Sequence, residues 1–452
     1  MAGLTHQQLC KWLPGVNVEG EAAGEITGFA IDSREIEPGW LFFALRGARL
    51  SGVDFLEEVA RRKGRSAFVP KEYSGPRFGL QLLRVDDVRS SLQELAKRYL
   101  EHLSVPVIAV SGSVGKTTTK DFLASLLGAR YRVVASVGSQ NTQLTVPLTL
   151  LRAKPPLDLF VLEMGMTAPG HLARLVDIAP PDMALLTAVE LVHAEGFSSL
   201  EGIAQAKAEL LSHPKTRLGI IPRSLTRWEA IGKAPHPQKL IFELDRASGG
   251  SDADYSLEGE GERLIFRLSG GERVESSWQI PGAHNRHNLL AAVACAHAMG
   301  VNGQEIADSI PSLKLPSQRL QPIDVRGIHV IDDAYNACEV SMCQALDAMP
   351  EPGEGGRRIA LFGEMRELGG FSDECHTRVA AYALDRLDLL LCVGVLTRPM
   401  LSHWRLAGRY ALWFPGLAEA GPALRAIARP GDVVLIKGAR ALACEKLIAM
   451  LL

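Results

Sequence analysis

Nearly continuous apolar stretches mark the middle of the 452-residue chain. Three of them are Val105–Val110, Leu157–Met164 and Met183–Val189. A strand with one solvated face would alternate apolar and polar residues, so these stretches predict strands buried on both faces of a parallel sheet. The amphipathic stretch Thr117–Leu127 and the Ala-rich stretch Asn285–Met299 predict helices beside that sheet.

The flanking regions have a different texture. Among the first hundred residues, Trp40–Leu45 predicts a strand and Phe55–Arg62 a helix. Alternating positions in Leu264–Leu268 and Val274–Ile280 predict an antiparallel ribbon. Pro311 bounds a linker that ends at Pro316.

Four more buried-strand stretches follow this linker, separated by helical segments: His329–Ile331, Ile359–Phe362, Leu389–Val395 and Val433–Ile436. This rhythm is typical of a second parallel α/β domain. At about 100–200 residues per domain, the length also suggests three domains. We expect an α/β protein with a small α/β domain (1–102), a central parallel-sheet domain with a phosphate loop (103–313) and a Rossmann-like C-terminal domain (314–452).

Composition narrows the class of protein. Apolar residues make up 47% and charged residues 22%, as in ordinary globular proteins. A net charge of −2 lacks the basic footprint of a nucleic-acid binder. The 7 scattered cysteines contain no Cys-x-x-Cys pair, which favours a reducing compartment. No apolar stretch reaches the roughly 18–20 residues that span a bilayer. We therefore expect a cytoplasmic protein without nucleic-acid partners or membrane insertion.

The strongest local motif is Gly112-x-x-Gly115-Lys116-Thr117, between a predicted strand and a predicted helix. Glycines let backbone N–H groups approach phosphate oxygens, the lysine neutralises them, and the hydroxyl reaches Mg²⁺. Val110 replaces the first glycine of the longer form of this motif, so the loop is a shortened variant. The candidate ATP-binding residues here are Gly112, Ser113, Gly115, Lys116, Thr117 and Thr118.

Glu163 follows a buried strand, at the sheet edge where ligands of parallel α/β proteins bind. A carboxylate there suits Mg²⁺, although it could also be an ordinary acid at a strand end. His193 follows the next strand and could reach the same crevice, but a lone histidine there is more often structural. By its local sequence, Lys207 reads as a solvated residue on a helix surface.

Other polar groups accompany the later elements. Asn285 and Asn288 open the Ala-rich helix, where they either cap it or read an adenine edge. Asp332-Asp333 follows a predicted strand, and two adjacent acids there favour a functional role over a structural one. Gly363-Glu-Met365 and Lys437-Gly438-Ala-Arg440 end two other strands, so all three motifs should line one sheet edge.

Together these residues resemble the Mur ligase family over nearly the whole chain. Asp32-Ser33-Arg34 with Pro38–Gly47 is similar to its UDP-binding segment, and Gly138–Leu151 to its substrate segment. Thr187–Lys207 is similar to the segment that supplies a histidine and a lysine, and Pro281–Asn288 to the adenine-contacting segment.

The C-terminal motifs Ile331–Ala337 and Gly363–Gly369 resemble most the family members that add D-alanyl-D-alanine. The sequence departs from the family pattern mainly at positions that shape the substrate site. Ser139 and Thr142 stand where asparagines are usual, and further departures lie at Ala188, Gln318, Cys338-Glu339 and Ala439.

The resemblance implies an ATP- and Mg²⁺-dependent ligase of peptidoglycan precursor synthesis, acting as a monomer. It would join D-alanyl-D-alanine to UDP-MurNAc-tripeptide through an acyl phosphate. It implies catalytic Lys116, His193 and Lys207, and metal ligands Thr117, Glu163, His193 and Lys207 in carbamoylated form. ATP would also contact Asn285, Asn288, Arg319, Asp333 and Asn336, and the UDP-linked substrate Ser33, Arg34, Phe42 and Asn141.

Two other hypotheses stay open at this point. One is a different ligase of the same architecture, either another Mur ligase or a folylpolyglutamate-type synthetase, against which the Asp32-Ser33-Arg34 segment argues. The other is a nucleotide-dependent switch or binding protein that no longer ligates.

Overall fold

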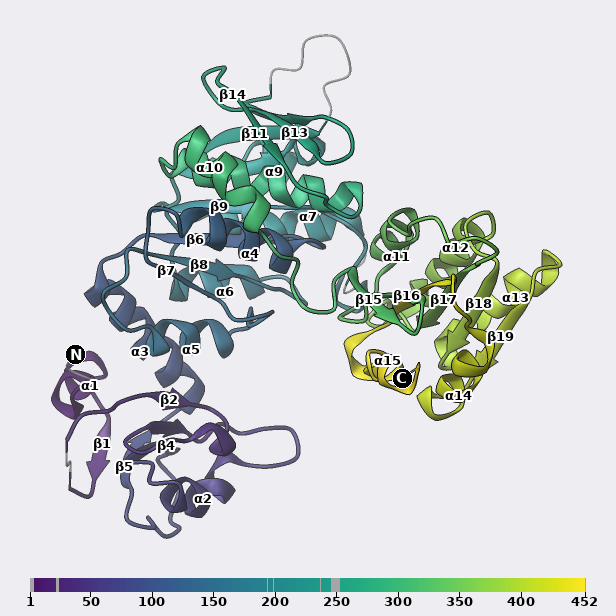
Figure 1. Cartoon of the computed structure of the whole chain (residues 1–452). Coiled ribbons are helices and arrows are strands. Elements are labelled where there is room, and N and C mark those ends of the chain that lie inside the picture. Colours follow the sequence, from purple (N-terminus) through teal and green to yellow (C-terminus); the bar gives the residue numbers. More distant parts are fainter. Residues whose placement is uncertain are drawn as a thin grey trace.

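The computed structural model describes residues 4–451, except 22–23, 193, 198, 236 and 245–252. Three sheets follow one another along the chain, each accompanied by helices (Figure 1). The predicted α/β class with three sheet-based units is therefore confirmed. Within the described residues, no helix has both the length and the apolar character needed to cross a membrane.

The N-terminal sheet has five strands in the order β1-β5-β4-β3-β2, and only β1 is antiparallel to its neighbour. The strands are β1 (Asn17–Glu19), β2 (Phe29–Ala30), β3 (Leu41–Phe43), β4 (Ser66–Pro70) and β5 (Gln81–Val85). The helices are α1 (His6–Trp12), α2 (Leu56–Arg61) and α3 (Val88–Leu103). The strand and the helix expected in this region correspond to β3 and α2, each shorter than predicted.

The central sheet has nine strands in the order β14-β13-β12-β11-β10-β9-β6-β8-β7. The strands are β6 (Val107–Ser111), β7 (Val133–Ala135), β8 (Leu159–Glu163), β9 (Met183–Leu186), β10 (Leu218–Pro222), β11 (Gln238–Leu244), β12 (Tyr255–Glu258), β13 (Arg263–Arg267) and β14 (Arg273–Ser277). The three apolar stretches became β6, β8 and β9, which lie side by side and parallel. The antiparallel ribbon is β13 and β14, and it extends the edge of this sheet.

Helices cover both faces of the central sheet (Figure 1). They are α4 (Lys116–Leu127), α5 (Thr145–Arg152), α6 (His171–Ile178), α7 (Leu200–Ala208), α8 (Glu229–Gly232), α9 (Ala283–Ala298) and α10 (Gly303–Ser309). Helix α9 is buried along Leu289–Ala296, which explains its all-round apolar sequence. Helix α5 packs against α3, and both contribute to one core shared with the N-terminal unit.

The C-terminal sheet has six strands in the order β15-β16-β20-β17-β18-β19. They are β15 (Gln321–Val325), β16 (Ile328–Asp332), β17 (Arg358–Gly363), β18 (Leu389–Val393), β19 (Ala411–Phe414) and β20 (Val433–Lys437), with helices α11 (Glu339–Asp347), α12 (Ser372–Ala383), α13 (Arg398–Leu406), α14 (Leu417–Ile427) and α15 (Lys446–Leu451). The four predicted strands are β16, β17, β18 and β20. The sequence analysis missed β15 and β19, which lie at the two edges and are only partly buried.

Strand register decides where the polar motifs lie. In the central sheet, Val110 of β6 pairs with Glu163 of β8, so the phosphate loop and this acid leave the sheet at the same edge. In the C-terminal sheet, Asp332 pairs with Ile436, just before Lys437. The carboxyl ends of parallel strands thus bring the polar motifs of each sheet to one edge.

Candidate functional site

A cavity of about 1290 Å³ lies between the central and C-terminal units. Its wall combines the phosphate loop, residues near Asn141 and the N-terminal part of α9 with the ends of C-terminal strands. The cavity therefore brings together polar groups from the two sheets. All three C-terminal motifs that were expected to share one edge contribute to or adjoin its wall, through Asp333, Arg366 and Lys437 among others.

The phosphate loop depends on its two glycines. Gly112 has φ +151° and Gly115 φ +81°, both outside the range that side chains favour. A Cβ on Gly112 would lie 1.9 Å from Thr187 Oγ1, and one on Gly115 would lie 2.3 Å from Asn288 Oδ1. The chain can thus enter α4 here only without side chains at these two positions.

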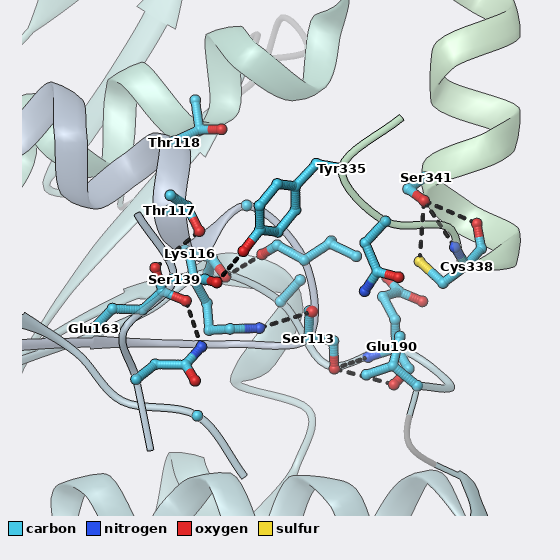
Figure 2. Close-up of a pocket in the computed structure, with 18 of the residues that line it drawn as sticks. Ser113, Lys116, Thr117, Thr118, Ser139, Glu163, Glu190, Tyr335, Cys338 and Ser341 are labelled. Atoms are coloured by element: carbon cyan, nitrogen blue, oxygen red, sulfur yellow. Dashed lines mark hydrogen bonds between the residues drawn. The ribbon is translucent and has the colours of Figure 1, made fainter. Parts of the chain in front are cut away.

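Lys116 is the first residue of α4 and folds back over the loop (Figure 2). Its ammonium donates to the carbonyl oxygens of Gly112 at 2.8 Å and Ser113 at 3.1 Å. Desolvation lowers the pKa of Lys116, which the nearby Glu163 carboxylate partly offsets. A cation with little water around it interacts strongly with phosphate charge.

Glu163 is buried, with 1% of its surface exposed, and both of its oxygens are engaged. Thr117 Oγ1 donates to Oε2 at 2.8 Å (Figure 2). Asn141 Nδ2 donates to Oε1 at 2.7 Å. A carboxylate beside a hydroxyl at a phosphate loop is the kind of oxygen donor set that Mg²⁺ takes. Asn141, predicted as a substrate-binding residue, lines the same cavity.

Lys207 was expected on a solvated helix surface, and this expectation is wrong. Only 2% of Lys207 is exposed, because α7 packs its neighbours Ile203, Ala204 and Ala206 into the core. Burial and the charge of Lys116 hold the pKa of Lys207 well below its usual range. The side chain therefore lies within electrostatic reach of Lys116, although it does not line the cavity itself. His193 lies outside the described residues.

The two asparagines at the start of α9 do not cap it, because the N-cap is Gly282 and no side chain bonds there. Asn288 instead accepts a hydrogen bond from Thr119 of α4 at 3.3 Å and donates to Asn285 at 3.3 Å. Both asparagines are buried and line the cavity. The capping alternative is thereby excluded, and Asn288 ties α9 to the phosphate-loop helix.

The C-terminal wall carries a buried ion pair. Lys437 donates to Asp333 at 2.5 Å and to the Asn336 carbonyl at 3.0 Å. Asp333 also accepts from the Leu320 amide at 3.2 Å. Arg319 reaches across to the central unit and donates to Thr117 Oγ1 at 3.2 Å. The predicted ATP contacts Arg319, Asp333 and Asn336 are thus grouped opposite the phosphate loop.

The predicted UDP-binding residues lie on the N-terminal unit, outside this cavity. Ser33 donates to Glu58 at 2.8 Å, and Arg34 pairs with Asp32 at 2.6 Å on the surface. The ring of Phe42 is in the core with 1% exposed, so it supports the segment from within and presents no open face to a ligand.

Sequence reasoning gave no role to Ser139, which lines the cavity, or to Lys120, which is not part of the cavity wall. Lys120, four residues after Lys116, is buried and donates to the Ser136 and Gly138 carbonyls. Ser139 was noted only as a departure, yet its hydroxyl is hydrogen-bonded to Tyr335 (Figure 2). The available signal for Lys120 was its helical i+4 spacing from the phosphate-loop lysine. This spacing does not predict that Lys120 is buried or which carbonyls it contacts.

Comparisons with known proteins agree with the architecture. The Mur ligase family catalytic domain matches residues 25–100, the Mur ligase middle domain 110–296 and the Mur ligase glutamate ligase domain 318–440. The UDP-N-acetylmuramoyl-tripeptide–D-alanyl-D-alanine ligase of Bacillus subtilis is 32% identical over 94% of this chain and 92% of its own. The Escherichia coli protein of the same name is 30% identical over 96% of each chain.

Solved structures give the same result. The crystal structure of MurF from Acinetobacter baumannii superposes with a TM-score of 0.84 at 26% identity, covering 99% of this chain and 98% of the other. MurF from Thermotoga maritima in complex with ADP gives 0.76 at 26%, covering 94% and 96%. Matches of this extent, in sequence and in structure, place the chain in the Mur ligase family, on its MurF branch.

Proposed function

We propose that this chain joins D-alanyl-D-alanine to UDP-MurNAc-tripeptide at the expense of ATP, in peptidoglycan precursor synthesis. The observation that carries the proposal is the cavity in which Lys116 of the phosphate loop faces Arg319 and the Asp333–Lys437 pair. The relatives named above, which align over more than nine-tenths of both chains, carry this activity in their names.

The reaction couples two transfers. The terminal carboxylate of the tripeptide attacks the γ-phosphorus of ATP, which forms an acyl phosphate and releases ADP. The dipeptide amine then attacks the acyl carbon, loses a proton and expels inorganic phosphate. Lys116 is placed to hold the phosphoryl oxygens, and Arg319 reaches the neighbouring Thr117 hydroxyl from the other unit. Positioning and electrostatic stabilisation thus carry most of the catalysis.

The donor set fits Mg²⁺ at one position. Thr117 and Glu163 offer a hydroxyl and a buried carboxylate that already contact each other at 2.8 Å, and they would hold the ion with phosphate oxygens. The ion would supply neutralisation of phosphate charge. We further assign a second ion to Glu163, His193 and Lys207 in carbamoylated form. The lowered pKa of Lys207 supports this, because only a neutral amine reacts with CO₂.

The three units divide the work. We propose that residues 1–102 hold the UDP moiety through Ser33 and Arg34, that 103–313 bind ATP, and that 314–452 close over both ligands. The protein would act as a monomer. We place it in the cytoplasm, because all seven of its cysteines are free thiols.

Phosphate release is the direct test. Purified protein with ATP, Mg²⁺ and UDP-MurNAc-tripeptide should release phosphate when D-alanyl-D-alanine is added. It should release none when either the tripeptide or the dipeptide is omitted. Turnover with a folate and glutamate would instead favour a folylpolyglutamate synthetase. E. coli FolC has the same fold, with a TM-score of 0.62, but only 19% identity over 80% of this chain. Binding of ATP without ligation would favour the switch hypothesis.

A further inference from the structure

A continuous network of contacts joins the phosphate loop, the loop 136–141 and the C-terminal unit. From the C-terminal unit, Arg319 donates to Thr117 at 3.2 Å, and its guanidinium lies 4.6 Å from the ring centre of Tyr335. The Tyr335 hydroxyl is hydrogen-bonded to Ser139 of the loop (Figure 2). Two separate contacts, Arg319–Thr117 and Tyr335–Ser139, therefore cross between the units at the cavity. The ring of Tyr335 connects them through its contact with Arg319.

Lys120 completes this network inside the central unit. It lies one turn after Lys116 in α4, and only 1% of it is exposed. Its ammonium donates to the Ser136 carbonyl and, at 3.0 Å, to the Gly138 carbonyl, with Asp121 as its ionic partner at 2.7 Å. A buried ammonium needs such partners, so the helix that begins at the phosphate loop also fixes the base of the Ser139 loop.

One carboxylate contacts both loops. Glu163 accepts from Thr117 of the phosphate-loop helix at 2.8 Å and from Asn141, two residues after Ser139, at 2.7 Å. A displacement of either loop is therefore transmitted to Glu163. The loop 136–141 belongs to the segment that resembles the family's substrate segment. We therefore expect the position of this loop to depend on whether the peptide substrate is bound.

Stacking holds Tyr335 in the orientation that reaches Ser139. Two guanidinium groups lie over its ring, that of Arg319 at 4.6 Å and that of Arg440 at 5.6 Å from the ring centre. Arg440 is itself held by Gln318 at 2.7 Å and Glu445 at 3.2 Å. Cations above an aromatic ring attract its face, so these two contacts help to hold the Tyr335 ring in place.

We propose that Tyr335 and Ser139 form a clasp that couples nucleotide binding to the position of the peptide-binding loop. Tyr335 is a positioning residue. Through its ring and its hydroxyl, formation of the Arg319–Thr117 contact influences the position of the loop that carries Asn141. The inference rests on the proposed function, since it takes ATP and UDP-MurNAc-tripeptide as the two ligands. It predicts that each ligand tightens the binding of the other through this hydrogen bond.

The test is a double-mutant cycle read by calorimetry. The dissociation constant of a non-hydrolysable ATP analogue with Mg²⁺ is measured with and without UDP-MurNAc-tripeptide, and the ratio of the two constants is the coupling. Tyr335→Phe removes the hydroxyl and keeps the stacked ring, whereas Ser139→Ala removes the other partner. The matched control is Tyr382→Phe, whose hydroxyl contacts Asp347 away from the cavity.

We expect wild type to bind the analogue more tightly with the tripeptide present. Each single variant should lose roughly two- to tenfold of this coupling, the usual range for one hydrogen bond. The double variant should lose no more than either single one, and Tyr382→Phe should behave as wild type. Additive losses, unchanged coupling in both single variants, or no coupling in wild type would overturn the clasp.

This outcome is separable from that of the proposed function. If wild type releases phosphate only when the tripeptide and the dipeptide are both present, while the variants keep full coupling, the ligase assignment stands and the clasp fails. If wild type binds both ligands but never ligates, the proposed function fails whatever the cycle shows. Since Ser139→Ala is a small change on a loop, it supplies the measurement should Tyr335→Phe not fold.

Discussion

Lys116 and Arg34 both offer a cation to a phosphorylated ligand under the proposed function, but their surroundings are opposite. Lys116 is desolvated, held by two backbone carbonyls, and has a lowered pKa. Arg34 has 78% of its side chain exposed and pairs with Asp32, whose pKa that pairing lowers to about 2. A partly buried, desolvated charge acts through a lower dielectric than water, while an exposed one is screened by water and salt. The first should therefore control the chemical step and the second only binding.

The largest effect should follow Lys116→Ala. Loss of this cation removes charge stabilisation that exists mainly in the transition state, so kcat should fall by roughly a thousandfold or more. Thermal unfolding should change little. The matched control is Lys233→Ala, a lysine of the same unit with 79% of its side chain exposed, which should retain wild-type turnover. Near-normal kcat in folded Lys116→Ala would break the comparison.

Lys207→Ala should come next, with kcat lower by roughly a hundredfold or more, since an anionic oxygen ligand would be lost. Small carboxylic acids such as acetate should restore part of the rate by occupying the vacated space. The carbamate itself is observable by ¹³C NMR after equilibration with ¹³CO₂. Its signal should be lost as pH falls through the lowered pKa of Lys207, because protonation removes the reactive amine. A wild-type spectrum without this signal would return Lys207 to a structural role.

His284 extends the comparison to stability. Burial, partly offset by Asp333, lowers its pKa to about 4 from 6.5. The unfolded chain therefore binds the proton first. The contribution of the neutral ring is complete above pH 6.5 and is lost as pH falls toward 4, by up to about 3 kcal/mol. Urea unfolding of wild type should show this decline, and His284→Gln should show a flatter profile between the same pH values.

The smallest effect on catalysis should follow Arg34→Ala. We expect the KM for UDP-MurNAc-tripeptide to rise by roughly tenfold, as for one charge-assisted contact, with kcat nearly unchanged. Raising the salt concentration should shrink this difference, because the exposed cation is screened. Initial rates at two ionic strengths measure both points. A change confined to kcat would mean that the exposed cation also acts on the chemical step.

The sequence by itself determined that a strand, the phosphate loop and a helix follow one another, and which residue types form the loop. Continuous apolar stretches located β6, β8, β9 and four C-terminal strands, because burial on both faces leaves no polar positions. The spacing of Gly112, Gly115 and Lys116 is recognisable as a local motif, although the close approach of Thr187 and Asn288 to the two glycines depends on the tertiary structure. The family resemblance added Lys207, which local sequence would have left on the surface.

Only the tertiary structure decided contacts between segments distant along the chain. The edge strands β15 and β19 are only partly buried. Polar residues interrupt the apolar positions of β15, and the apolar stretch of β19 is only four residues long, so neither stood out in the sequence. Burial of Lys207 depends on the packing of α7, and the non-capping role of Asn288 on its contact with Thr119 of α4. Tyr335 meets Ser139 across 196 residues of sequence. Local propensities carry no information about such pairs, because the meeting is set by how two sheets are placed.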